Sequence, residues 1–481
     1  MSTVESEEQI GEKVTPLREL FHFSHFKSFY RLYVPIAIII GFVAGIAMVV
    51  FQLLIIGFTA VFSILPIFIT PIIGGAFSGF MIYAGRREVQ GSGISMAIEM
   101  THEPYSIDKG TAITKLLATS ISIGSGNPVG REGPAVLIGA SIGNTIGRRL
   151  GFHEDSHLRV ILMIGSAAAT AGIYKAPLGG ALFATEAPYR RDARLGYFIP
   201  TVIAALTSYI VYAAIMGIEP LLHFGASFNL TLEVIPLLIV FGIIAGGISI
   251  LFAVVLMITR NFFTVKLPNW VDPIAGSALA CIAIFITGLA VDPSLTIAGM
   301  GYEVINSLAT TTVPLTILFM LLIGKLFASS FVVAGRTSGG VLASSLFVGA
   351  MLGAIFGEVF YPDQVGAFIV LGMGAVLAAT TNTPVATTIM MLEMSLSFEL
   401  AIPLALCIAV SYLVSGGSSL YEGQKVSRED EETDYYKLAN KKPDPEDRLG
   451  HDENIANPSN YKNLLEEDGE HRAQGEDETG S

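Results

Sequence analysis

The chain has 481 residues, of which 52% are hydrophobic and only 14% are charged, and its formal net charge at pH 7 is −13. Soluble globular domains carry about 25% charged residues, so this composition excludes an ordinary soluble domain. A multi-pass protein of a cell membrane is the class that remains.

The predicted elements begin with a cytoplasmic or interfacial segment over residues 1–28 and continue with a membrane domain over residues 29–421. Its longer apolar runs approach the roughly 20 residues that span a bilayer as a helix. Shorter runs interrupted by Gly or Pro predict tilted helices that cross only part of the bilayer. The fold class we expect is therefore all-α and polytopic. The longer runs are Val34–Phe51, Val160–Phe183, Val234–Ile258, Pro314–Leu322 with its flanks, and Leu400–Val414.

Two glycine-flanked segments come next in the chain, GSGIS at residues 91–95 and GREGP at residues 130–134. Glycine lets the backbone turn tightly and leaves amide groups unshielded, and Pro134 suits the first turn of a helix. A helix that starts inside the protein offers unpaired amides and the positive end of its dipole. Such a site attracts an anion without a full positive charge, so that the anion can also leave.

A carboxylate, Glu132, lies within the second of these segments. It can occupy the predicted anion site as a tethered competitor and vacate it when it is protonated or displaced. The alternative is a purely structural pairing of Glu132 with Arg131. Adjacent residues on a helix do not face each other well, so we favour Glu132 as a gate.

The second half of the chain echoes the first in two blocks. In the segment SGGVLASSLFVGAMLGAIFG, four glycines repeat four glycines of the first half at a constant offset of 210 residues. Close packing of membrane helices favours small residues four apart, which explains one such match but not two blocks in the same order. The matched glycines are 130, 139, 143 and 147 with 340, 349, 353 and 357.

The second block pairs Pro177 with Pro384 and Glu186 with Glu393, both at an offset of 207 residues. Two halves with interrupted helices, over about residues 29–218 and 231–421, predict a transporter whose substrate lies between the halves. The repeat does not by itself reveal whether the halves are parallel or inverted.

The motifs GSGIS and GREGP, the Gly-Gly turn at 339–340 and a late Tyr421 resemble the signature segments of the CLC family of chloride channels and chloride/proton antiporters. The resemblance implies a homodimer in the lipid bilayer, with two inverted halves and an independent chloride pathway in each subunit. It implies neither an enzyme nor a resident cofactor, metal or nucleic-acid partner. Glu132 would be the external gate. By motif, the anion site would comprise Ser92, Gly130, Arg131, Gly133, Gly340, Val341, Leu342 and Tyr421.

The chain also departs from the family pattern. Ser95 stands where the first motif usually ends in Pro, and the third motif lacks its usual Phe and Pro. The internal proton-relaying glutamate of the antiporters falls on Ala187, which cannot titrate, although Glu186 is adjacent. A proton path through Glu132 and Glu186 is therefore one expectation and passive chloride conduction is the other.

An intramembrane serine hydrolase is the alternative enzyme class, since the chain has many Gly-Ser turns. That chemistry needs a histidine close to the serine within the membrane, whereas all eight histidines lie in polar or flanking segments. The remaining segment, residues 422–481, is acidic and poor in apolar residues, and we expect it to be a disordered tail.

Overall fold

The computed structural model describes residues 23–428 except 106, 109, 225–227, 229, 267 and 293. Residues 1–22 of the predicted N-terminal segment and residues 429–481 of the predicted tail lie outside the described residues, whereas residues 422–428 are hydrogen-bonded to the rest of the chain. Within these bounds the chain is helical, with two isolated β-bridges in place of strands. Eight helices in the described part are long and apolar enough to cross a membrane, which confirms the all-α, multi-pass class.

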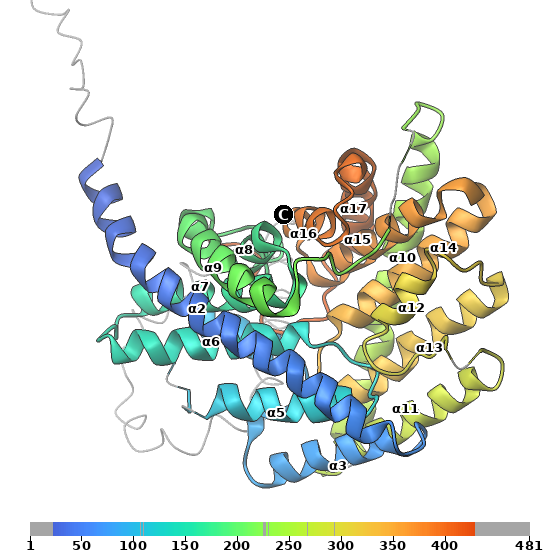
Figure 1. The fold of residues 1–481 in the computed structure, drawn as a ribbon, viewed down its shortest axis with the longest axis horizontal. Helices are drawn as coiled ribbons and strands as arrows, with labels where there is room; N and C mark the ends of the chain where they lie inside the picture. The colour runs from blue at the N-terminus through green and yellow to red at the C-terminus, as the bar shows by residue number, and fades with distance from the viewer. Residues whose placement is uncertain are drawn as a thin grey trace, which may run out of the picture. The chain divides into compact units, whose positions relative to one another are not determined.

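The first half of the chain consists of eight helices in the described range, coloured blue to green in Figure 1. The long α2 packs across α5, α7 and α9. Four of the eight, α3, α4, α5 and α8, are too short to cross a bilayer. The helices are α2 Phe23–Phe62, α3 Thr70–Tyr83, α4 Ile94–His102, α5 Thr111–Gly124, α6 Glu132–Arg149, α7 Asp155–Tyr174, α8 Pro177–Glu186 and α9 Phe198–Met216.

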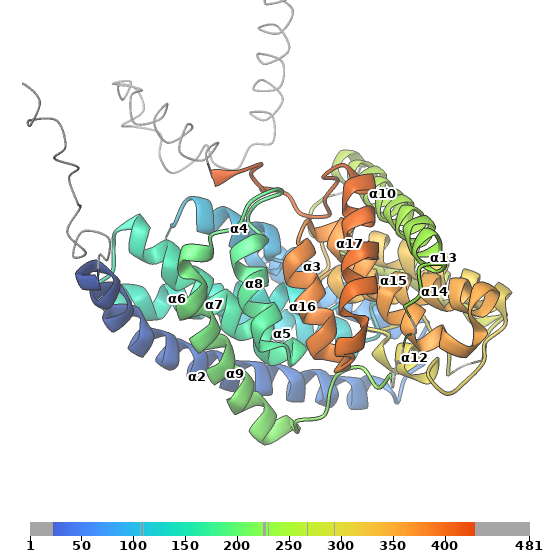
Figure 2. The ribbon, with the colours of Figure 1, turned by 90° about the horizontal axis from the view of Figure 1, so that it is seen from above.

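The second half repeats this order with eight more helices, coloured green to orange in Figure 1. Figure 2 shows from above that α8 of the first half lies beside α16 of the second, and the two helices are in contact. The helices are α10 Ile235–Lys266, α11 Asp272–Gly288, α12 Tyr302–Ser307, α13 Leu315–Ala334, α14 Leu342–Phe360, α15 Val365–Thr381, α16 Pro384–Ser395 and α17 Ala401–Ser415. Short 3₁₀ turns occur at Arg87–Val89, Leu195–Tyr197, Pro362–Gln364 and Phe398–Leu400.

One predicted span is wrong in its extent. The apolar run Val160–Phe183 does not form one helix, because α7 ends at Tyr174 and α8 begins at Pro177. Lys175 adopts a left-handed conformation with φ of 54°, and a proline disfavours a helical conformation in the residue before it. The break turns the chain and leaves α8 as a short separate helix.

The repeated glycines lie where helices cross. A Cβ atom on Gly139 of α6 would lie 2.2 Å from the carbonyl oxygen of Gly165 in α7, and one on Gly165 would lie 2.1 Å from that of Gly139. In the second half, Gly349 of α14 meets Gly372 of α15 in the same way, at 2.3 and 2.2 Å. Only glycine allows backbones this close, so the glycine echo records one helix crossing that is built twice.

The two halves also cap each other. The carboxylate of Glu186, at the end of α8, accepts hydrogen bonds from the amides of Val385 and Ala386 at 3.2 and 2.7 Å, at the start of α16. Glu393 of α16 accepts equivalent bonds from the first amides of α8 at 3.0 and 2.8 Å. Reciprocal contacts of this kind are those of a two-fold axis. The end of each helix meets the start of the other, so α8 and α16 run antiparallel, which agrees with the inverted halves that the resemblance implied.

Candidate anion site

The three glycine segments meet at one point in the interior. A Cβ atom on Gly133 would lie 3.1 Å from Cβ of Ser92 and 3.4 Å from Cα of Gly340. Because Gly133 has no side chain, the GSGIS and SGGVL segments can approach the start of α6 this closely. The structure thus brings together motifs that are up to 248 residues apart in the sequence.

Two glycines of the predicted anion site, Gly130 and Gly340, use their amides to bond each other. The amide of Gly130 donates to the carbonyl of Gly340, and the amide of Gly340 donates to the carbonyl of Gly130, both at 2.7 Å. These amides are therefore committed to each other and are not available to an anion. Gly130 and Gly340 thus join the two halves and shape the predicted site rather than donating to an anion.

Unpaired amides remain at the starts of α6 and α14. The first helical hydrogen bond of α6 runs from the amide of Ala135 to the carbonyl of Arg131. In α14 it runs from the amide of Ser345 to the carbonyl of Val341. Among the described contacts, the preceding amides of Arg131–Gly133 and Val341–Ala343 have no carbonyl partner, as is usual in a first helical turn. Pro134 takes its predicted place in the first turn of α6, where its missing N–H removes no bond.

The Glu132 side chain lies between these two helix starts. It is fully buried, and its Oε1 accepts a hydrogen bond of 2.7 Å from the hydroxyl of Tyr302. Its Oε2 lies 2.2 Å from the point where a Cβ of Gly130 would be, and the amide nitrogen of Ala343 lies 3.0 Å from that same point. No hydrogen-bond partner is present for Oε2. The carboxylate therefore lies beside the first amides of α6 and α14, but it accepts no hydrogen bond from them.

Arg131 is not a direct partner of this carboxylate. Its Nε lies 4.0 Å from Oε1 of Glu132, while its Nη atoms bond the side chain of Gln52 and, at 3.3 Å, the carbonyl of Ile173. The guanidinium carbon lies 5.9 Å from the centre of the Tyr302 ring. The structural pairing of Arg131 with Glu132 is thus weak, and the Arg131 side chain instead braces the surrounding helices.

Tyr421 lies in the same interior region. Its hydroxyl is buried and has no hydrogen-bond partner, and it is close enough to Glu132 to interact with it electrostatically. The segment is anchored by the Glu422 amide, which donates to Oγ of Ser95 at 3.1 Å. A proline at position 95 could not make that bond, so the departure from the family motif fixes the Tyr421 segment onto α4.

A cavity of about 460 Å³ leads to the Ser92 loop. Its wall carries three arginines and two glutamates, and two of these arginines form ion pairs, Arg260 with Glu422 and Arg336 with Asp272. The Ser92 Oγ accepts a bond of 3.3 Å from the amide of Ile94 and lines this cavity. The charged lining residues are Arg87, Glu88, Arg260, Arg336 and Glu422.

The structure places Glu186 apart from this group. Glu186 lines a separate cavity of about 730 Å³ together with Arg190, Arg191 and Asp192, and both of its oxygens are held by α16 amides. Ala187 follows it at the end of α8. The predicted proton path through Glu132 and Glu186 therefore has its two members in different surroundings.

Tyr302 bonds the gate directly, although it stands in none of the motifs recognised in the sequence. A signal for it exists: GMG at residues 299–301 repeats GSG at residues 91–93 at an offset of 208, close to the offset of the other blocks. The loop that carries Tyr302 is the second-half counterpart of the loop that carries Ser92.

The family profile described as Voltage gated chloride channel matches residues 74–416. This chain belongs to that family. The match spans most of the described helices, from α3 to the end of α17. The chain is therefore a multi-pass membrane protein of the CLC family of channels and transporters, and the serine hydrolase alternative finds no support.

Relatives and solved structures agree with the assignment. The chain is 28% identical over 392 residues to the uncharacterized protein MJ0305 of Methanocaldococcus jannaschii, covering 81% of this chain and 95% of that protein. It is 26% identical over 359 residues to the voltage-gated ClC-type chloride channel ClcB of Escherichia coli, covering 72% and 83%.

Two crystal structures share the fold. A slow cyanobacterial Cl⁻/H⁺ antiporter superposes with a TM-score of 0.69 at 20% identity, covering 80% of this chain and 94% of that one. A CLC-type fluoride/proton antiporter superposes with a TM-score of 0.71 at 22% identity, covering 85% and 100%. At these identities the likeness speaks for the fold alone.

Proposed function

We propose that the protein transports chloride across a membrane through the site between α6 and α14, with Glu132 as its gate. The observation that carries the proposal is the position of the Glu132 carboxylate. It is fully buried, and it lies beside the starts of two helices whose first amides have no carbonyl partner among the described contacts. A site that holds a carboxylate in this way suits a monovalent anion of similar charge when the carboxylate leaves.

The surroundings support anion passage rather than tight anion storage. The proposed donors are backbone amides and the hydroxyl of Tyr421, and among the described residues the nearest cation, Arg131, stays 4.0 Å from the Glu132 carboxylate. Such donors stabilise an anion less strongly than an ammonium or guanidinium group in contact with it. The cavity at the Ser92 loop gives the site a polar route to its surroundings.

The proposal includes two modes, proton-coupled exchange and passive conduction, and a homodimeric assembly. Liposomes that contain the purified protein and a chloride gradient separate the modes, because an exchanger drives protons uphill and a channel does not. Mass measurement of the detergent-solubilised protein tests the dimer.

The gate is tested by Glu132→Gln, which fixes the side chain in a neutral state. We expect chloride efflux from liposomes to persist and any uphill proton movement to disappear. Glu233→Gln, at an exposed acid in the segment before α10, is the matched control and should behave as the wild type. Wild-type liposomes that release no chloride would overturn the function, and a Glu132→Gln variant that still pumps protons would overturn the gate.

A further inference from the structure

We propose that Tyr302 is a latch on the gate: its hydroxyl holds the Glu132 carboxylate in the anion site and so sets how readily an anion displaces it. The inference rests on the proposed function and adds to it a residue that none of the recognised motifs contains. Tyr302 comes from the second half of the chain, whereas Glu132 comes from the first.

The contact itself is short and buried. The Tyr302 hydroxyl donates to Oε1 of Glu132 at 2.7 Å, with Tyr302 8% and Glu132 0% exposed. It is the one hydrogen bond that the described residues give to this carboxylate, since Oε2 has none. A hydrogen bond to an ionised acceptor is stronger than one between neutral groups, and its loss leaves a buried charge uncompensated.

The loop that carries Tyr302 is held from below by a buried lysine. The Lys325 Nζ of α13 donates to the carbonyls of Ile297 and Gly299 at 2.9 and 2.5 Å. The amide of Gly299 in turn donates to the carbonyl of Gly126 at 3.0 Å, which ties the loop to the first half. These hydrogen bonds restrict the movement of the loop that carries Tyr302.

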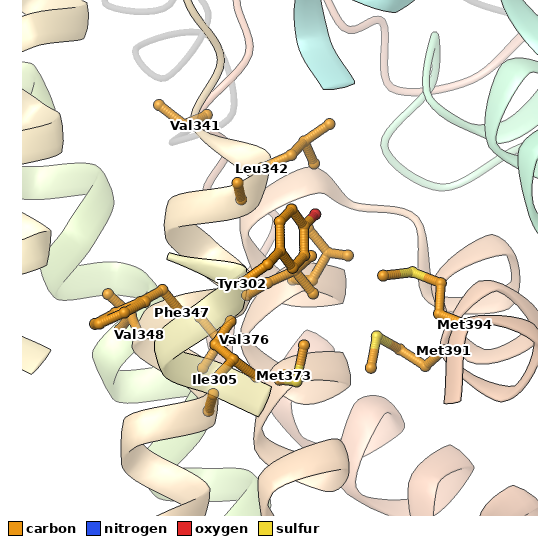
Figure 3. Packing of buried hydrophobic residues seen from close by; sticks show 14 of the residues in the cluster. Tyr302, Ile305, Val341, Leu342, Phe347, Val348, Met373, Val376, Met391 and Met394 are labelled. Atoms are coloured by element: carbon orange, nitrogen blue, oxygen red, sulfur yellow. The ribbon is translucent and has the colours of Figure 1, made fainter. Parts of the chain in front are cut away.

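The turn before Tyr302 is fixed as well. Gly301 has a φ of 89°, a conformation that favours glycine, and a Cβ atom there would lie 2.4 Å from Cδ2 of Phe347. Figure 3 shows the Tyr302 ring near Leu342 at the start of α14, among the buried side chains of the core. The ring thus points its hydroxyl toward the gate from a position with little freedom.

The first half contains an equivalent buried lysine, which holds the loop that carries Ser92. The Lys115 Nζ donates to the carbonyls of Val89 and Gly91 at 3.1 and 2.7 Å, and Lys115 precedes Lys325 by 210 residues. The first clamped loop presents Ser92 to the proposed anion path, and the second presents Tyr302 to the gate. The same lysine contact therefore positions an anion-binding residue in the first half and the partner of Glu132 in the second half.

The latch has a defined energetic role. Because the carboxylate and the anion compete for the same space, any bond that stabilises the carboxylate there weakens the apparent affinity for the anion. Tyr302→Phe removes the hydroxyl and keeps the ring beneath the Arg131 guanidinium. The other charged or titratable groups in electrostatic range of Glu132 stay in place in that variant: Arg131, Tyr174, Lys325 and Tyr421.

The test is a double-mutant cycle on the full-length protein, with chloride binding measured by calorimetry and chloride efflux measured in liposomes. We expect Tyr302→Phe to tighten chloride binding and to accelerate efflux, each by about ten-fold, as one charge-assisted hydrogen bond would. In a Glu132→Ala background the same substitution should change neither quantity, because the latch then has nothing to hold.

Tyr212→Phe, which alters a buried tyrosine of α9, is the matched control and should behave as the wild type. An unchanged Tyr302→Phe variant would overturn the latch, and so would an equal effect with and without Glu132. Failure of the proposed function is distinguishable, because the wild type would then neither bind chloride nor release it.

Discussion

Tyr421 shows most directly what a single side chain contributes to the proposed site. Its hydroxyl is buried and unpartnered, and an unpaired buried hydroxyl is destabilising unless a ligand or water meets it. Its segment is pinned to α4 through Ser95. The hydroxyl is therefore held ready for a ligand that is present only part of the time.

We expect Tyr421→Phe to weaken chloride binding about ten-fold, which corresponds to about 1.4 kcal/mol for one hydrogen bond to an ion. Calorimetric titration of the purified protein measures this directly, with Tyr212→Phe as the control. Unchanged affinity would remove Tyr421 from the anion site.

The sequence motifs predict which segments form the site, but they do not predict which hydrogen bonds the residues of those segments make. Ser92, Glu132 and Tyr421 could be chosen because their motifs are local. The mutual bonds of Gly130 and Gly340, and the bond from Tyr302 to Glu132, join residues 210 and 170 positions apart. No local pattern encodes such pairings, so the sequence could not show which amides were already occupied.

Among the helices, the crossings of α6 with α7 and of α14 with α15 are the closest-packed repeated feature. We expect Gly139→Ala to destabilise the fold by about 1–3 kcal/mol, because the added methyl group would meet a backbone carbonyl that cannot move aside. Gly349→Ala should act in the same direction for the same reason. Thermal unfolding in detergent measures both.

Gly57→Ala in α2 is the control, since a Cβ atom there has nothing within 4 Å. That variant should be neutral or slightly stabilised, because alanine is the better helix former by about 1 kcal/mol. If all three substitutions had the same effect, the close crossings would not be the cause.

The helix scale is also where the repeat in the sequence was most useful. The glycine offset predicted the doubled crossing, and the pairing of Pro177 with Pro384 and Glu186 with Glu393 marked α8 and α16. The orientation of the halves did not follow, because a similar offset fits parallel and inverted copies alike. The prediction of one span over Val160–Phe183 was wrong because the sequence stays apolar through the turn before Pro177.

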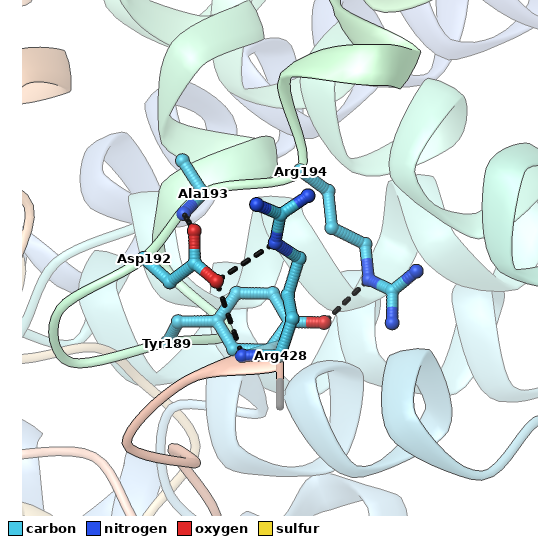
Figure 4. A network of polar contacts seen from close by, with 5 residues as sticks. All are labelled: Tyr189, Asp192, Ala193, Arg194 and Arg428. Atoms are coloured by element: carbon cyan, nitrogen blue, oxygen red, sulfur yellow. Dashed lines mark hydrogen bonds and ion pairs between the residues drawn. The ribbon is translucent and has the colours of Figure 1, made fainter. Parts of the chain in front are cut away.

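Over the whole molecule, one ion pair joins the loop after α8 to the last described residue. Figure 4 shows Asp192 between the Ala193 amide and Arg428. Arg428 donates to Asp192 Oδ2 from Nε at 2.7 Å and from its amide at 3.1 Å, and the Ala193 amide donates to Oδ1 at 2.7 Å. Burial raises the pKa of Asp192, but these hydrogen bonds outweigh it and leave the pKa below its ordinary value.

This pair gives stability a defined dependence on pH. A carboxyl whose pKa is lowered by folding stabilises the fold above its unfolded pKa of about 3.9 and loses that contribution as pH falls through the folded value. The Arg428 side chain is 50% exposed, so solvent screening limits the contribution to about 0.5 kcal/mol.

We therefore expect Asp192→Asn to lower the stability slightly at pH 7 and to have a progressively smaller effect as the pH falls through the lowered pKa of the folded carboxyl. Unfolding curves at several pH values measure the difference. Asp363→Asn, at an exposed acid of a 3₁₀ turn, is the control. A deficit for Asp192→Asn that persists unchanged in acid would contradict the ion-pair account.

The mutual hydrogen bonds of Gly130 and Gly340 have a consequence for biosynthesis. The ribosome makes the first loop long before the second, and until residue 340 emerges the Gly130 amide and carbonyl lack the partners that complete them. A nascent chain that ends before residue 340 contains Glu132 but lacks the start of α14 that lies beside it. We therefore expect the gate to reach its folded arrangement only after residue 340 has been synthesised.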